Sequence, residues 1–489
     1  MSKKWGIFCA LTVGIIKAGM TAELSVGMAE ISITPDRPVS LAGQFHQRIA
    51  RSVESPCMAC VLALESREAG KEPEQAIMVS VDVVSIPAEV QRDFRAYVAA
   101  RLPGFDTNKL FLAATHTHTG PTLDQNRFSD YEDAIQPKEY LSFLYERMAE
   151  AVVKAWEGRK PGGVAWGLGH AVVGHNRRAV YADGTSVMYG KTDKPEFTHI
   201  EGWEDHAVDV LCFTDAGGRL VTAAVTVPCP SQVVEGISQV SSDYWGHVRE
   251  NLKAKYGQDL VVLGFCGPGG DQAPRPMLRK AAESRMEKLR KLSRKQELGR
   301  RIARAFDETW EAIRQDIRND VVFAHRVERF EVPGRIITEA EYKDAQNNYR
   351  SFEKRLETAK NLQEKSIAQG RMRWFKRTVE LYETQNDNPP INRLEVHVLR
   401  LGDVAIATNP FELFQDYAMR VHGRTPAEQT VLIQLASPLD ERHSYLPSAR
   451  AVAGGGYSAV PQSTPVGPEG GQMLVDRTLS VISELFGKK

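Results

Sequence analysis

Net charge is absent from this sequence, because 62 lysine and arginine residues balance 62 aspartate and glutamate residues. A chain without a positive excess has no electrostatic reason to bind nucleic acid or an anionic membrane surface. Neither is therefore expected as a partner. The composition, 42% hydrophobic and 25% charged, is typical of a globular protein that buries a sizeable core.

Apolar stretches long enough to cross a bilayer, which takes about 20 residues, are also lacking. One shorter run, residues 6–16, follows a basic start at Lys3 and Lys4 and precedes small residues at 18–22. This pattern is typical of a secretory signal peptide. We therefore predict that residues 1–22 are a signal peptide and that the protein is exported to the periplasm or the medium. The alternative is a buried N-terminal segment.

Cysteine is scarce, with six residues at positions 9, 57, 60, 212, 229 and 266. Loss of Cys9 with a signal peptide would leave five, an odd number, so at least one thiol would be free or metal-bound. Cys57 and Cys60 form a single CxxC motif, and no second pair stands at zinc-ribbon spacing. This pair is interpreted as part of the core or as an incidental disulfide.

Strand-like and helix-like patterns alternate along the chain. Residues 76–84 form a continuous apolar run typical of a buried strand, and residues 88–101 and 140–157 have helical periodicity. This predicts an α/β (α+β) fold, a layered β-sheet core flanked by helices. Residues 25–487 are expected to form one domain with a charged helical insertion at about 277–386, made of a long helix (277–315), a short strand pair (321–332) and a second helical region (338–386).

The main candidate for a functional site follows an apolar run at residues 110–114. Two histidines, His116 and His118, come next, and Gly120-Pro121 ends the segment. If the strand continued through them, residues i and i+2 would share a face. Such a pair suits a metal ligand with a second imidazole beside it as acid, base or hydrogen-bond donor. The alternative is a pair of surface histidines at a strand edge.

Three more side chains of ligand type stand at or just after the ends of apolar runs: Cys229, Glu412 and Tyr445. Glu412 is expected in the first turn of a helix, where a solvated carboxylate is also favoured by the helix dipole. Tyr445 alone could be an ordinary loop aromatic. Spacing alone cannot establish that these residues meet His116.

An ordered set of motifs resembles the neutral/alkaline non-lysosomal ceramidase family over about residues 25–485. They are Ala114-Thr-His-Thr-His-Thr-Gly-Pro121, Ile31-Ser-Ile-Thr-Pro35, Asn176-Arg177, Gly270-Asp271, Pro410-Phe-Glu412, and Tyr445 before a Gly-Tyr turn. The resemblance implies a zinc (Zn2+) site with His116, Glu412 and Tyr445 as ligands. It also implies that His118 lies beside the metal and that Arg177 is an anion or oxyanion partner.

The sequence departs from the family pattern in two places. Cys229 stands at or near the position of the second histidine ligand, where a thiolate could bind zinc; the alternative is a buried thiol. Gly267 stands where the family has its serine nucleophile, so the loop 267–270 is expected to supply backbone N–H groups to an anion. Cys266, one residue away, is a weak candidate nucleophile. Metal-activated water would then be the attacking group, with Asp271 or Asp243 orienting its neighbours; Asp243 is also a candidate helix N-cap.

These residues predict an exported zinc-dependent hydrolase that cleaves an amide (N-acyl) or related polar bond. The substrate class stays open between a small molecule, a lipid and a glycan or amino sugar. A catalytically silent binding or scaffold protein is the alternative, and a cysteine hydrolase using Cys266 is a third possibility. The sequence does not indicate an oligomeric state.

Overall fold

The computed structural model describes residues 23–68, 70–440 and 444–487 of the chain. The signal-peptide segment predicted at residues 1–22 lies outside the described residues and stays a prediction. Helices and strands alternate along the described chain, and the α+β fold class is confirmed.

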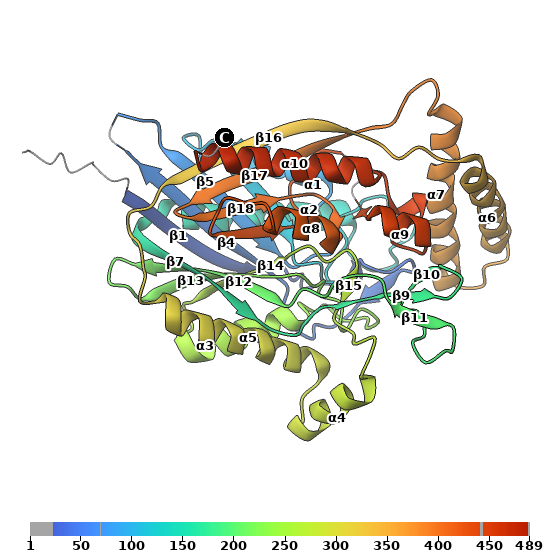
Figure 1. The fold of residues 1–489 in the computed structure, drawn as a ribbon, viewed down its shortest axis with the longest axis horizontal. Helices are drawn as coiled ribbons and strands as arrows, with labels where there is room; N and C mark the ends of the chain where they lie inside the picture. Colours follow the sequence, from blue (N-terminus) through green and yellow to red (C-terminus); the bar gives the residue numbers. More distant parts are fainter. Residues whose placement is uncertain (1–22, 69, 441–443, 488–489) are drawn as a thin grey trace, which may run out of the picture.

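Two β-sheets pack face to face and form the centre of the molecule (Figure 1). The larger sheet contains, in spatial order, β14 (Val261–Cys266), β13 (Leu220–Val227), β12 (Ala207–Asp215), β7 (Lys160–His170), β1 (Glu23–Ser32), β4 (Met58–Arg67), β5 (Glu74–Val81) and β6 (Leu110–Ala114). The smaller sheet contains β16 (Phe323–Pro333), β17 (Ile391–Leu401), β18 (Val404–Thr408) and β20 (Gln429–Ile433). Pairing is antiparallel except for β5–β6, β13–β14 and β18–β20, which are parallel.

Helices cover the outer faces of both sheets. The larger sheet is covered by α1 (Ala88–Ala99), α2 (Pro137–Glu157), α3 (Tyr244–Tyr256) and α5 (Arg294–Ile313), and the smaller one by α8 (Gln415–His422) and α10 (Pro468–Leu485). Residues from both sheets, such as Leu62 and Leu399, fill the layer between them. Because β4, β5 and β6 are buried on both faces, they read as apolar runs rather than as alternating patterns.

The charged region is not one helical unit, and the prediction of a single helix over 277–315 is wrong. It divides into α4 (Lys280–Arg290) and α5, because Lys291 adopts a left-handed conformation and Ser293 begins α5 with a capping box to Gln296. The predicted short strand pair is instead one strand, β16, which pairs with β17. Only α6 (Glu339–Glu357) and α7 (Leu362–Thr384) form a hairpin that projects at one end (Figure 1).

A buried carboxylate anchors α5. Glu297 accepts hydrogen bonds from Arg290, Arg300 and Arg301 at 2.8–3.1 Å. Burial alone would raise the pKa of Glu297, but the hydrogen bonds from Arg300 and Arg301 lower it to about 2. The folded state therefore holds a carboxylate whose stabilising effect is present above its unfolded pKa and is lost as the pH falls towards 2.

Replacing this carboxylate by an amide tests the network. Glu297→Gln is expected to lower the free energy of unfolding by about 2 kcal/mol at pH 7, because the buried side chain would lose charge-assisted hydrogen bonds from partly exposed arginines. Urea unfolding measured at pH 7 and pH 3 should show a smaller loss at pH 3. Glu308→Gln, on an exposed position of the same helix, is the control and should change little. A loss of unfolding free energy that does not depend on pH would contradict the stabilising role of the ionised Glu297.

The remaining short elements bring distant loops together near the site. They are β2 (Val39–Leu41), β3 (Arg48–Ala50), β8 (His175–Asn176), β9 (Arg178–Tyr181), β10 (Ser186–Met188), β11 (Phe197–Ile200), β15 (Gln272–Ala273), β19 (Glu412–Leu413), β21 (Tyr445–Leu446) and α9 (Ala449–Gly454), with 3-10 turns at Thr107–Lys109 and Pro461–Ser463. None of the helices in the described part of the chain is long and apolar enough to span a bilayer. Cys57 and Cys60 are buried free thiols, which confirms them as core residues.

Candidate active site

Most of the predicted site residues follow the carboxyl ends of five strands, β6, β13, β14, β18 and β20, whereas Arg177 lies between β8 and β9. Parallel neighbours end at the same edge of a sheet, so the loops after β13 and β14 meet, as do those after β18 and β20. The two sheets are joined at this edge, where the backbone N–H of Ala114 donates to the carbonyl of Leu435 at 3.2 Å. Residues separated by more than 300 positions are thereby brought into one group.

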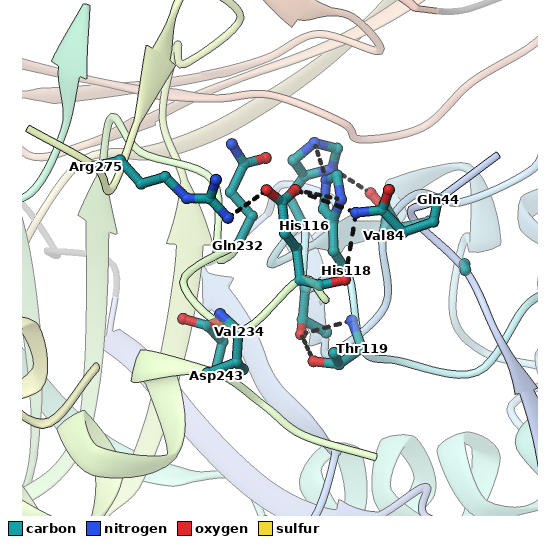
Figure 2. Close-up of polar contacts among 12 residues, drawn as sticks. Gln44, Val84, His116, His118, Thr119, Gln232, Val234, Asp243 and Arg275 are labelled. Atoms are coloured by element: carbon teal, nitrogen blue, oxygen red, sulfur yellow. Dashed lines mark hydrogen bonds and ion pairs between the residues drawn. The ribbon is translucent and has the colours of Figure 1, made fainter. Parts of the chain in front are cut away.

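His116 and His118 lie in the turn after β6 rather than on the strand. The strand ends at Ala114, and His116 has a left-handed φ of 63°, so the prediction that strand alternation aligns the two rings is wrong. The turn brings them together instead, with the two Nε2 atoms 3.4 Å apart (Figure 2). Nδ1 of His116 lies 2.5 Å from the carbonyl of Val84 and must carry the proton that it donates there.

Glu412 and Tyr445 are register partners in the parallel pair β19–β21. Glu412 therefore stands three residues before α8, and its predicted place in the first turn of that helix is wrong. Its Oε2 lies 3.3 Å from Nε2 of His116. Burial alone would raise the pKa of Glu412, but His116, Arg177 and a hydrogen bond from Tyr445 lower it, so it is ionised at neutral pH. Burial and the neighbouring Glu412 raise the pKa of Tyr445 well above its ordinary value.

Arg177 places a buried guanidinium beside this pair. Its Nη2 is 3.3 Å from the Tyr445 hydroxyl and 3.8 Å from Glu412 Oε2, and it donates to the carbonyl of Gly270 at 2.8 Å. Burial opposes the charge, but Tyr445, Tyr189 and Glu412 outweigh it and raise the pKa of Arg177. Arg177 therefore lies next to the candidate ligands Glu412 and Tyr445, where it was predicted.

Cys229 is not brought into this group. Its thiol packs among apolar residues of the layer between the larger sheet and helices α3 and α5, and the sulfur donates to the carbonyl of Pro230 at 3.5 Å. Burial raises the pKa of Cys229 well above its ordinary value. The buried-thiol alternative describes it better than the predicted ligand role does.

The glycine loop after β14 does not offer the predicted free N–H groups. The amides of Gly267, Gly269 and Gly270 donate to Val227, Gln434 and Leu413, respectively. A side chain at Gly270 would collide with the carbonyl of Glu412, since an added Cβ would lie 2.3 Å from that oxygen. The loop is therefore a packing surface for Glu412 rather than an anion cradle.

Asp271, Asp243 and Cys266 act as buried structural groups. Asp271 accepts from the Asn176 amide at 2.9 Å and from the backbone N–H of Gln415 at 3.2 Å, and burial raises its pKa to about 6. Asp243 caps α3 by accepting from the N–H of Tyr244, as its alternative interpretation predicted. Burial raises the pKa of the Cys266 thiol to about 12, so the thiolate needed for a cysteine hydrolase is disfavoured.

Sequence inspection missed the carboxylate that faces His118. Glu235 Oε2 lies 3.6 Å from Nδ1 of His118, and the carboxylate is also contacted by Arg275 at 2.5 Å and by the Gln44 amide at 3.4 Å. Figure 2 shows Gln44 and Arg275 on opposite sides of the two histidines. Glu235 follows two valines in a loop and belongs to no motif, so no local signal marked it.

Two donor atoms of the kinds that bind zinc converge in this group. Nε2 of His116 lies 3.3 Å from the ionised Oε2 of Glu412, and the Tyr445 phenol hydrogen-bonds the same carboxylate. Imidazole nitrogen and carboxylate oxygen are usual zinc ligands. In the described part of the chain there is no group of three or more His, Cys, Asp or Glu side chains suited to hold a metal. A metal here would therefore depend on Tyr445 as well as on His116 and Glu412.

Comparison with known proteins places the fold. No protein-family model matches the chain. The crystal structure of neutral ceramidase from Pseudomonas aeruginosa superimposes with a TM-score of 0.67 at 17% identity, covering 95% of this chain and 75% of that one. A ceramidase complexed with C2 gives a TM-score of 0.63 at 16% identity, covering 95% of this chain and 76% of that one. The chain therefore has the neutral ceramidase fold.

A sequence match points the same way. Neutral ceramidase of Pseudomonas aeruginosa is 26% identical over 227 residues, which are 45% of this chain and 30% of that protein. The match thus spans less than a third of that relative's length. Together with the fold, it supports a neutral ceramidase-like family, as the resemblance in the motifs predicted.

Proposed function

We propose that the protein is a zinc-dependent hydrolase that cleaves an amide (N-acyl) or related polar bond. The observation that carries the proposal is the convergence of His116 Nε2 and Glu412 Oε2, 3.3 Å apart, with the Tyr445 phenol beside them. These three side chains would hold the metal. Bound zinc would polarise the substrate carbonyl and lower the pKa of water in its coordination sphere to about 7.

His118 is placed to move the proton. Burial, together with the charges of His116, Arg177 and Arg48, holds the pKa of His118 well below its ordinary value, so the ring is neutral and can accept a proton. Glu235, 3.6 Å from Nδ1, would stabilise the imidazolium. In the proposed reaction, water adds to the acyl carbon as His118 takes its proton. His118 then protonates the amine nitrogen as the C–N bond breaks.

Arg177 would stabilise the oxyanion that forms when water adds. Its guanidinium is buried and fixed by the Gly270 carbonyl and by the Tyr189 hydroxyl, to which Nη1 donates at 3.3 Å. A preorganised cation in a site shielded from water stabilises developing negative charge more strongly than a mobile one. The absence of a serine at Gly267 is consistent with water as the nucleophile.

Zinc content measured together with hydrolysis tests the proposal. The purified chain should contain about one zinc per molecule, and a chelator should remove both the metal and activity on a panel of N-acyl, ester and amino-sugar substrates. A catalytically silent binding protein is favoured instead if the chain takes up no zinc, and Cys229 outside the group is the observation behind that alternative. Export is also proposed, from the residues before position 23; N-terminal sequencing of the mature protein would test it.

A further inference from the structure

A cavity of about 410 Å³ adjoins the candidate active site. Its wall includes Ser85, the chain neighbour of the Val84 that holds His116, and Pro410, two residues before Glu412. Another part of the lining comes from α7 of the projecting hairpin, through Trp374. Chain neighbours of the candidate site and residues of the hairpin therefore line the same cavity.

Three arginines converge on the cavity: Arg127, Arg373 and Arg377. Arg127 and Arg373 are fixed by backbone carbonyls, with Arg127 Nη2 2.7 Å from the carbonyl of Gln44 and Arg373 donating to those of Asn126 and Arg127. None of the three forms an ion pair with another described residue, and no described residue accepts a hydrogen bond from the Arg377 side chain. Burial lowers the pKa of Arg127, the charges of Asp124 and Tyr457 raise it, and the charges of Arg373 and Arg377 lower it.

Three carboxylates line the same cavity, and one of them, Asp124, offsets the charge of Arg127. Asp440 forms an ion pair with Arg393 at 2.7 Å. Asp124 accepts from the backbone N–H of Asn126 at 2.8 Å, and Glu89 stands in the first turn of α1, where the helix dipole stabilises it. Arg373 and Arg377 therefore remain in the cavity wall as guanidinium groups without an ion-pair partner among the described residues.

Aromatic rings connect the arginines to the site. Trp374 and Phe45 line the cavity with ring centroids 5.7 Å apart, and Arg371 stacks on both rings. Tyr457 lies 5.6 Å from Trp374 and 5.8 Å from Tyr445. Burial and Glu412 raise the pKa of Tyr457, whereas Arg371 and Arg127 lower it. This phenol therefore interacts electrostatically with a candidate ligand and with an arginine of the cavity.

Planar guanidinium groups bind carboxylates and sulfates through paired hydrogen bonds. We propose that the cavity binds an oxyanion, a carboxylate or a sulfate, carried by the substrate next to the scissile bond. This inference rests on the proposed function and narrows its substrate class to acidic small molecules, such as acidic sugar derivatives that stack on Trp374. A neutral lipid would leave the arginines without a partner.

Binding without turnover tests the inference. Glucuronate and sulfate, with glucose as the neutral counterpart, are titrated into the full chain by calorimetry. Arg377→Gln, which breaks no hydrogen bond or ion pair within the described chain, is expected to weaken anion binding about tenfold, the value of one charge-assisted hydrogen bond. Arg350→Gln, an exposed arginine on α6 outside the cavity, is the matched control.

The outcomes separate this inference from the proposed function. The proposed anion site is supported if either anion binds and if Arg377→Gln weakens this binding while Arg350→Gln does not. The anion that binds more tightly identifies the preferred oxyanion. Equal binding of glucose and glucuronate, no anion binding, or equal effects of the two variants would overturn it. The titration repeated in His116→Ala should give the same affinity, because the arginines do not need the metal. Hydrolysis that fails while anion binding persists would count against the function alone.

Discussion

His116→Ala is expected to abolish zinc binding and with it hydrolysis. The Nε2 of His116 is the atom that faces both Glu412 and His118, and its orientation is fixed by the hydrogen bond to Val84. Without it, Glu412 and Tyr445 are too few to retain the ion. A bound metal contributes several kcal/mol to the transition state, so the rate should fall at least about a thousandfold. Elemental analysis and kcat/KM measure the two effects.

A stability readout makes the same test independent of turnover. A ligand present at 100 times its dissociation constant stabilises the folded state by about 2.7 kcal/mol, so zinc should raise the Tm of the wild-type chain and not that of His116→Ala. His199→Ala removes an exposed histidine of β11 and should behave as the wild type does. Zinc retained at wild-type stoichiometry in His116→Ala would contradict the proposed ligand set.

The regular core could be predicted from sequence because its periodicity is strong. The helix expected at 88–101 is α1 (Ala88–Ala99), and that expected at 140–157 is α2 (Pro137–Glu157); both have apolar residues at helical spacing. The charged region could not be divided in the same way, because α4 buries no residue and so has no apolar stripe to mark where it ends. A local signal was present, however: Ser293 and Gln296 have capping-box spacing and mark the start of α5.

For the candidate site, the sequence could predict which residue types take part and the order of their motifs, but not every position in space. The convergence of His116, Glu412 and Tyr445 was implied by the family resemblance, and the β19–β21 pair accounts for it physically. The place of Cys229 depends on how the backbone turns after β13, since its thiol faces the layer under α3 and α5. Glu235 reaches His118 only because that same loop folds back, which spacing along the chain does not encode.

His118→Gln is expected to lower kcat by about a hundredfold to ten-thousandfold, the usual contribution of a general acid–base group. Zinc content should stay at the wild-type value, because His116, Glu412 and Tyr445 remain. Gly43 leaves room for this ring, since an added Cβ there would lie 2.6 Å from His118, and glutamine occupies a similar volume. Added imidazole should restore part of the rate, since it can replace the missing proton acceptor.

Glu235→Gln separates proton transfer from metal binding. It keeps the size of the side chain near Nδ1 of His118 but removes the charge that stabilises the imidazolium, so kcat should fall less than in His118→Gln and imidazole should not restore it. In the double variant, the loss should be close to that of His118→Gln alone, because the carboxylate acts through the ring. If His118→Gln instead loses its zinc, His118 is a ligand, and the proton must be carried by another group.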